Sequence, residues 1–216
     1  FAIGWDHARY GITPPATLLH QANPVRQGWS AGRSAFAGRR RAATPAVHDW
    51  LDLRLQAWRL GVAFEDVQVT PHFLAQIAAT HCPVTGKALT RTAGADDQAT
   101  IVRLNDEAAF AAGNLAVLSL RAARELARLR QHASGAQVVQ EALGRAAQAD
   151  VPTVDGRGQE LSASQWQRLA AMCSYTTAVP DSMLAELPLS VLPPNRVRVL
   201  QPLQALQVVL TLLFCQ

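Results

Sequence analysis

Residues 100 to 130, TIVRLNDEAAFAAGNLAVLSLRAARELARLR, give the clearest indication of how this chain folds. A β-branched run over residues 100 to 104 ends at a polar turn, which is typical of a short strand. After a Gly-Asn pair, a second apolar run covers residues 115 to 118. From Ser119 onward, apolar residues recur at helical spacing, namely Leu120, Ala123, Leu126 and Leu129. The stretch therefore predicts the order strand, loop, strand, helix.

Most of the remaining sequence predicts helices. Thr44 followed by Pro45 is typical of a helix start, and Gly61 is typical of its end. The core-facing side of this helix is expected to carry Val47, Trp50, Leu51, Leu55 and Trp58. Ser162 with Gln165 forms a capping box that predicts another helix start. We therefore expect an α+β, predominantly α-helical protein in which a small ββα module is embedded among helices.

Three parts of one continuous domain are expected. Residues 1–43 are rich in Gly, Pro and Arg, so they are predicted to form an irregular basic arm that packs on the body through its aromatic side chains. Residues 44–132 hold helices and the ββα module, and residues 133–216 form a helical C-terminal part. Within the arm, Arg33 and the run from Arg39 to Arg41 are candidates for phosphate contact.

Composition narrows the class of protein. The 216 residues are 49% hydrophobic and 17% charged, which excludes a chain disordered through excess charge. The net charge of +4 comes from arginine, because Lys87 is the single lysine. Arginine binds phosphate bidentately, which suits a nucleic-acid partner. A GC-rich genome replaces lysine by arginine as well, so both interpretations stay open.

The cysteines and the longest apolar run indicate in which cellular compartment the protein is expected. Cys82, Cys173 and Cys215 are widely separated and form no CxxC pair, which favours a reducing cytoplasm over a disulfide framework. The apolar run from Leu206 to Cys215 is shorter than the ~20 residues that cross a bilayer, so no membrane partner is expected. An apolar final helix must bury its face in the core or in a partner, and a homodimer through this helix is possible.

The segment from Cys82 to Arg130 resembles the HNH, or ββα-metal, family of endonucleases, in particular the phage-type branch that includes relatives of recombination endonuclease VII. The matching elements, in chain order, are Cys82-Pro83-Val84-Thr85-Gly86, Ile101-Val102-Arg103-Leu104-Asn105-Asp106, Phe110, Gly113-Asn114-Leu115, Ser119 and Arg121-Ala122. In that family, one divalent cation is held between the first strand and the helix, where it neutralises charge on the scissile phosphate. A base on the first strand activates water.

The resemblance assigns roles to individual residues of this chain. Asn114 matches the asparagine that supports the loop, and Arg103 occupies the position of the base. Val102 stands where the metal-binding aspartate is expected, and Ala123 stands where the helix supplies Asn or His. Neither side chain can ligate a cation. We therefore expect no metal site and no cofactor; Mg²⁺ or Mn²⁺ would bind only if ligands are relocated, the candidates being Asp97, Asn105, Asp106 and Glu107.

The helix of this module carries the expected binding surface. Arg121, Arg124 and Arg128 follow i, i+3, i+7 spacing and share one face, where they could lie along a DNA backbone. The leading hypothesis is a nucleic-acid-binding protein with an HNH-like module that is catalytically impaired, so whether the chain is an enzyme stays open. The alternatives are a non-enzymatic interaction or scaffold protein and an active metal-dependent nuclease with relocated ligands.

Overall fold

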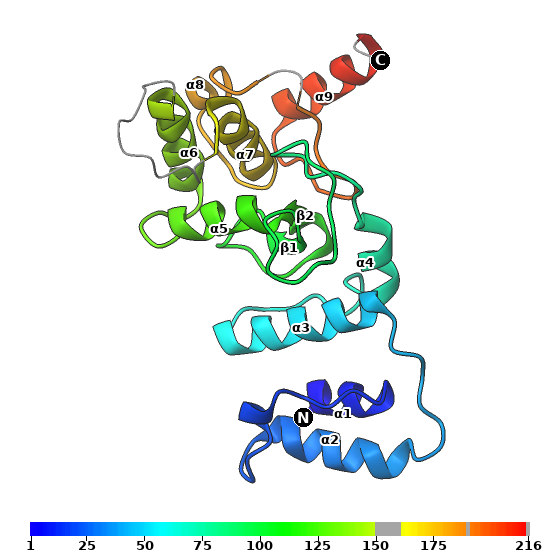
Figure 1. Cartoon of the computed structure of the whole chain (residues 1–216). Coiled ribbons are helices and arrows are strands. Elements are labelled where there is room, and N and C mark those ends of the chain that lie inside the picture. The colour runs from blue at the N-terminus through cyan, green and yellow to red at the C-terminus, as the bar shows by residue number, and fades with distance from the viewer. Residues whose placement is uncertain (150–160, 189–190, 215–216) are drawn as a thin grey trace. The chain divides into compact units, whose positions relative to one another are not determined.

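Helices dominate the computed structural model, which describes residues 1 to 149, 161 to 188 and 191 to 214. In this part of the chain, the one sheet is a two-stranded antiparallel pair (Figure 1). The α+β, mainly helical class is thereby confirmed. The chain divides into two compact units, Phe1–Ala75 and Gln76–Gln216. This division differs from the boundaries expected near residues 43 and 132.

The first unit is helical from its beginning. Its elements are α1 (Ala2–Arg9), the 3₁₀ turn η1 (Ala16–Leu18), α2 (Pro24–Ala35), α3 (Pro45–Leu60) and most of α4 (Pro71–Ile77). The prediction of an irregular arm over residues 1–43 is therefore wrong. Asn23 accepts a hydrogen bond from the amide of Val25, and Pro24 takes the first helical position, so α2 has a strong N-terminal cap.

The glycines that suggested irregularity are contact points between α1 and α2. A Cβ atom on Gly4 would lie 1.8 Å from the carbonyl oxygen of Val25, and one on Gly28 would lie 1.9 Å from that of Phe1. Each glycine thus lies directly against the backbone of the other segment, Gly4 against Val25 and Gly28 against Phe1. Because the packing of the helices stabilises them more than residue propensity does, glycine is tolerated inside both.

Helix α3 begins and ends where the sequence predicts. The Thr44 side chain accepts a hydrogen bond from Val47 N, and Gly61 ends the helix in the left-handed region at φ 65°. Trp58, expected in the core, is 44% exposed. Arg54 forms ion pairs with Asp6 of α1 and with Asp66, at 3.2 Å for the latter. This arginine therefore connects three segments of the first unit.

The second unit contains the predicted strand, loop, strand, helix sequence. Its described elements are β1 (Ala99–Arg103), the 3₁₀ turn η2 (Ala112–Asn114), β2 (Leu115–Ser119), α5 (Leu120–Leu129), α6 (Ala136–Ala149), α7 (Ala163–Tyr175), α8 (Asp181–Leu184) and α9 (Pro202–Phe214). Helices α6 and α7 pack against each other (Figure 1). The capping box of Ser162 and Gln165 at the start of α7 is confirmed.

One hydrophobic core joins the hairpin to these helices. It includes Leu118 of β2, Leu126 of α5, Val139 of α6 and Leu169 of α7, each fully buried. The hairpin and α5 therefore form one wall of this core and are held by it. None of the described helices has the length and apolar character needed to cross a membrane.

Candidate nucleic-acid interface

Strands β1 and β2 and helix α5 form a hairpin followed directly by a helix. The strands are antiparallel, with Val102 opposite Ala116 and Arg103 opposite Leu115. The hydroxyl of Ser119, the last residue of β2, accepts a hydrogen bond from Ala122 N at 3.3 Å and caps α5. Because strand and helix share this residue, the orientation of α5 relative to the hairpin is closely constrained.

Asn114 braces the loop that connects the two strands. Its Oδ1 accepts a hydrogen bond from Asn105 N at 2.8 Å. Its Nδ2 donates to the carbonyl oxygens of Asn105 at 2.8 Å and of Ala109 at 3.0 Å. The side chain is buried, so these bonds are shielded from water. One amide group near the end of the loop thus binds both the beginning of the loop, at Asn105, and its middle, at Ala109.

Gly113, which precedes this asparagine, lies against the C-terminal segment. The amide of Arg198 donates to the carbonyl oxygen of Gly113 at 2.9 Å. A Cβ atom on Gly113 would lie 2.8 Å from that of Arg198. The Gly-Asn pair therefore has two structural roles, since the glycine permits a close approach of chains and the asparagine braces the loop.

Arg103 points into the same loop. Its Nη1 donates to the carbonyl oxygens of Asp106 at 3.0 Å and of Ala108 at 2.8 Å, and the guanidinium lies 4.4 Å from the centre of the Phe110 ring. Burial, followed by repulsion from Arg130, lowers its pKa. Arg130 in turn donates to the carbonyl oxygen of Arg103 at 2.7 Å. The two arginines both bind backbone oxygens around the loop.

The positions that the resemblance assigns to metal ligands hold apolar side chains. Val102 is partly buried and packs against the central core of the second unit. Ala123 of α5 is 9% exposed. Neither side chain has an oxygen, nitrogen or sulfur atom to offer a cation.

The residues considered as relocated ligands are held by other contacts. Asp97 accepts from the hydroxyl of Thr90 at 3.1 Å. Asn105 donates to the carbonyl oxygen of Thr176 at 2.9 Å. Asp106 accepts from Gly135 N at 3.2 Å, and Glu107 accepts from the Ser134 hydroxyl at 3.1 Å. Among the described residues, no three His, Cys, Asp or Glu side chains lie close enough together to share a metal ion.

The three arginines of α5 differ in their surroundings. Arg124 is 51% exposed and pairs with Asp96 at 3.2 Å, which is itself 60% exposed. Arg128 is 58% exposed and pairs at 2.5 Å with Glu125, which is 7% exposed. Arg121 is half-buried, and its backbone amide donates to Asp96 O at 3.0 Å. The structure therefore places Arg124 and Arg128 on the surface, each beside a carboxylate.

Cys82 lies under the start of α5. Its Sγ accepts hydrogen bonds from Ser119 N at 3.2 Å and Thr85 N at 3.5 Å. Burial raises the pKa of this thiol, but the hydrogen bonds from Ser119 and Thr85 outweigh burial, and the net pKa is lowered. The Cys-Pro-Val-Thr-Gly turn therefore connects the segment before the hairpin to the cap of α5.

The first unit holds a second basic surface. Six arginines and no acidic residue occur between Asp6 and Asp49. Five of them are exposed: Arg26, Arg33, Arg39, Arg40 and Arg41. Arg33 stacks over the ring of Trp29 at 4.8 Å, and Arg41 N donates to the carbonyl oxygen of Arg9 at 2.9 Å. The absence of acidic residues from this stretch is the sequence signal that marks it as basic throughout.

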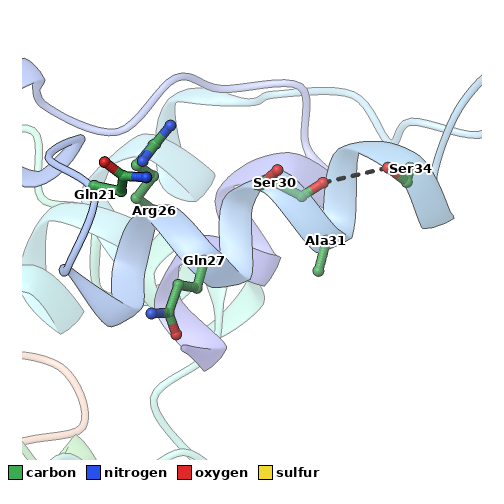
Figure 2. Close-up of a pocket in the computed structure, with 6 residues that line it drawn as sticks. All are labelled: Gln21, Arg26, Gln27, Ser30, Ala31 and Ser34. Carbon is green, nitrogen blue, oxygen red and sulfur yellow. Dashed lines mark hydrogen bonds between the residues drawn. The ribbon is translucent and has the colours of Figure 1, made fainter.

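A shallow hollow lies on α2 within this basic region. It is lined by Gln21, Arg26, Gln27, Ser30, Ala31 and Ser34. Figure 2 shows Arg26 and Gln27 directed to different sides of the helix, and Ser34 donating to the carbonyl oxygen of Ser30 at 3.5 Å. The polar groups do not converge on one point, so the hollow offers no constellation for catalysis.

Comparisons of the chain with protein-family models, with curated proteins and with solved structures found no match.

Proposed function

We propose that this protein binds nucleic acid through the arginine face of α5 and has little or no hydrolytic activity. The face consists of Arg121, Arg124 and Arg128, one and two turns apart along a helix that is capped by the hairpin. Guanidinium groups bind phosphate oxygens bidentately, and each neutralised phosphate releases a counterion. The observation that carries the proposal is the exposure of Arg124 and Arg128, both more than half accessible.

The ion pairs of these arginines leave them available to phosphate. The pair of Arg124 with Asp96 is exposed at both ends, and such surface pairs contribute about 0 to 1 kcal/mol. A phosphate can therefore replace Asp96 at small cost. Glu125 is buried beneath Arg128 and orients it without covering it.

The proposal of impaired hydrolysis rests on Val102 and Ala123. Without a cation between strand and helix, the transition state loses several kcal/mol of charge stabilisation, and each ~1.4 kcal/mol slows hydrolysis about tenfold. We expect supercoiled plasmid to stay intact during overnight incubation with Mg²⁺ or Mn²⁺. Nicking that EDTA and Asn114→Ala suppress would instead establish the active nuclease with relocated ligands.

Binding is tested by fluorescence anisotropy with labelled duplex and single-stranded DNA and RNA, from about 20 to 200 mM salt. The triple variant Arg121→Ala, Arg124→Ala, Arg128→Ala should weaken binding and flatten the plot of log affinity against log salt by about two to three units. The matched control, Arg145→Ala with Arg168→Ala, removes two exposed arginines elsewhere in the second unit and should change the slope little. Absence of binding at the lowest salt contradicts the proposal.

The arginine run of the first unit supplies a competing interface. Arg39→Ala, Arg40→Ala and Arg41→Ala together should leave the slope close to that of the wild type if α5 makes the contacts. If this variant flattens the slope and the α5 variant does not, nucleic acid binds the first unit and the assignment to α5 is wrong. The alternative of an interaction or scaffold protein is favoured by a separate observation, the exposed apolar side chains of α9.

A further inference from the structure

Helix α9 is rotated so that its polar side faces the protein and its apolar side faces solvent. The inward stripe, at spacing i, i+3, i+4, i+7, is Gln204, Gln207, Val208 and Thr211, all buried or half-buried. The exposed large apolar residues of this helix are Leu203, Leu206, Val209, Leu210, Leu212, Leu213 and Phe214. This is the reverse of the usual arrangement, in which the apolar stripe covers the core.

Specific contacts fix this rotation. Gln204 is 4% exposed, and its Nε2 donates to the hydroxyl of Ser174 in α7 at 2.6 Å. Gln207 donates to the carbonyl oxygen of Pro188 at 3.5 Å. Just before the helix, Gln201 donates to the carbonyl oxygens of Thr177 and Val179. The amide side chains therefore orient α9, and turning the helix would break the bonds of Gln204 and Gln207.

The outer stripe has the pattern of a helix-pairing seam. Leu203, Leu206, Leu210 and Leu213 are 45% to 68% exposed and follow the 3-4-3 spacing of a and d positions in a heptad. Seven large apolar side chains of α9 are 44% to 79% exposed, and contiguous exposed apolar surface of this kind marks interaction sites.

We propose that α9 pairs with α9 of a second copy of this chain, so that the two leucine seams bury each other in a twofold dimer. The helix contains no charged residue, so its surface matches an uncharged apolar surface such as its own. A stripe made almost entirely of leucine is self-complementary, as a twofold interface requires. A helix lying on a membrane carries a charged outer face, which α9 lacks.

The test is the mass of the full-length chain in solution, measured by light scattering during size-exclusion chromatography between about 1 and 100 μM. We expect twice the 23.3 kDa of the chain at the upper end of this range. The double variant Leu206→Glu, Leu210→Glu should weaken dimerisation at least ~100-fold and elute as a monomer, because it places like charges opposite each other in the seam. Its circular dichroism should match the wild type, since both side chains are exposed.

The matched control is Val67→Glu, which puts the same charge on an apolar residue that is 88% exposed and lies outside α9. This variant should dimerise as the wild type does. A wild-type monomer at 100 μM overturns the proposal, and so does a dimer that survives the double substitution. Co-sedimentation of a monomeric wild type with phosphatidylcholine vesicles would identify a lipid surface as the occupant instead. A series of ever larger species would exclude a closed dimer.

Discussion

Asn114 holds both backbone polar groups of Asn105, accepting from its amide and donating to its carbonyl oxygen, each at 2.8 Å. The Asn114 side chain thus binds the Asn105 backbone as a residue of a neighbouring strand would, and this closes the loop between β1 and β2. Asn105 in turn donates to the carbonyl oxygen of Thr176, immediately after α7. Two amide side chains in series, Asn114 and then Asn105, thus connect the hairpin loop to the end of α7.

Asn114→Ala should destabilise the second unit by about 2 to 4 kcal/mol, because it removes three hydrogen bonds and leaves partly buried backbone groups of Asn105 and Ala109 without these partners. Urea unfolding followed by far-UV circular dichroism measures the change. The control Asn195→Ala removes one exposed bond, to the carbonyl oxygen of Gln76, and should cost less than about 1 kcal/mol. Equal effects from the two substitutions would contradict a bracing role for Asn114.

Gly4→Ala should separate α1 from α2. The added Cβ would lie 1.8 Å from the carbonyl oxygen of Val25, so the helices must move apart, at a cost of about 2 kcal/mol or more. Tryptophan fluorescence reports the loss, since four of the five tryptophans lie in the first unit. Gly144→Ala in α6 meets no atom within 4 Å and should stabilise the chain by about 0.5 to 1 kcal/mol. A stabilising Gly4→Ala would show that the helices do not touch there.

Arg54→Ala should destabilise the first unit by about 2 kcal/mol or more, because Asp6, 15% exposed, loses its partner. The stacking of Arg54 on Trp50, at 4.7 Å, is lost as well. Arg54→Lys should recover part of this stability, since the charge returns without the planar group. The exposed Arg59 gives the control, and Arg59→Ala should change the unfolding midpoint little.

Cys173 and Cys82 should change the pH dependence of stability in opposite directions, because the pKa of Cys173 is raised and that of Cys82 is lowered. Burial raises the pKa of Cys173 to about 11, above its ordinary value of 9.0. Its contribution is therefore complete below pH 9 and is lost as the pH rises to about 11, by at most ~1.4 kcal/mol per pH unit. The stability difference between the wild type and Cys173→Ala, measured by urea unfolding in reducing buffer, should shrink over this window.

The pKa of Cys82 is shifted in the opposite direction to that of Cys173. Burial raises its pKa, but hydrogen bonds from Ser119 and Thr85 lower the net pKa, so the folded state favours the thiolate. Its contribution is present above the ordinary thiol pKa and is lost as the pH falls through the lowered value. The stability difference between the wild type and Cys82→Ala should therefore grow with rising pH. Parallel trends for the two variants would contradict the assigned environments.

The ββα element was predictable because its signals are local. Strand β1 begins within one residue of the predicted run, and β2 and α5 follow in the predicted order. Ser119 and the Ser162 capping box act over three residues, so their effect can be read directly from the sequence. The DNA-binding role of α5 and the roles that the HNH resemblance assigns to single residues stay predictions, since the comparisons found no match and the structure holds no partner.

Other features depended on contacts between distant residues. The helices in residues 1–43 were missed because Gly4 and Gly28 suggest flexible chain unless a neighbouring backbone is known to touch them. Asp106 accepts a hydrogen bond from Gly135, and Glu107 accepts one from Ser134. Both bonds join segments more than 25 residues apart in the sequence. No local pattern distinguishes these carboxylates from ligands that face solvent.

The amino-acid sequence by itself determined where helices and strands begin and end in most of the chain, because caps, proline and hydrophobic period act within a few residues. For some elements, only the tertiary structure decided which side faces inward. Helix α9 is the clearest case, since its leucine stripe predicts a buried face, whereas the hydrogen bond from Gln204 to Ser174 turns that stripe outward. The physical reason is that orientation depends on partners that folding brings together from remote parts of the chain.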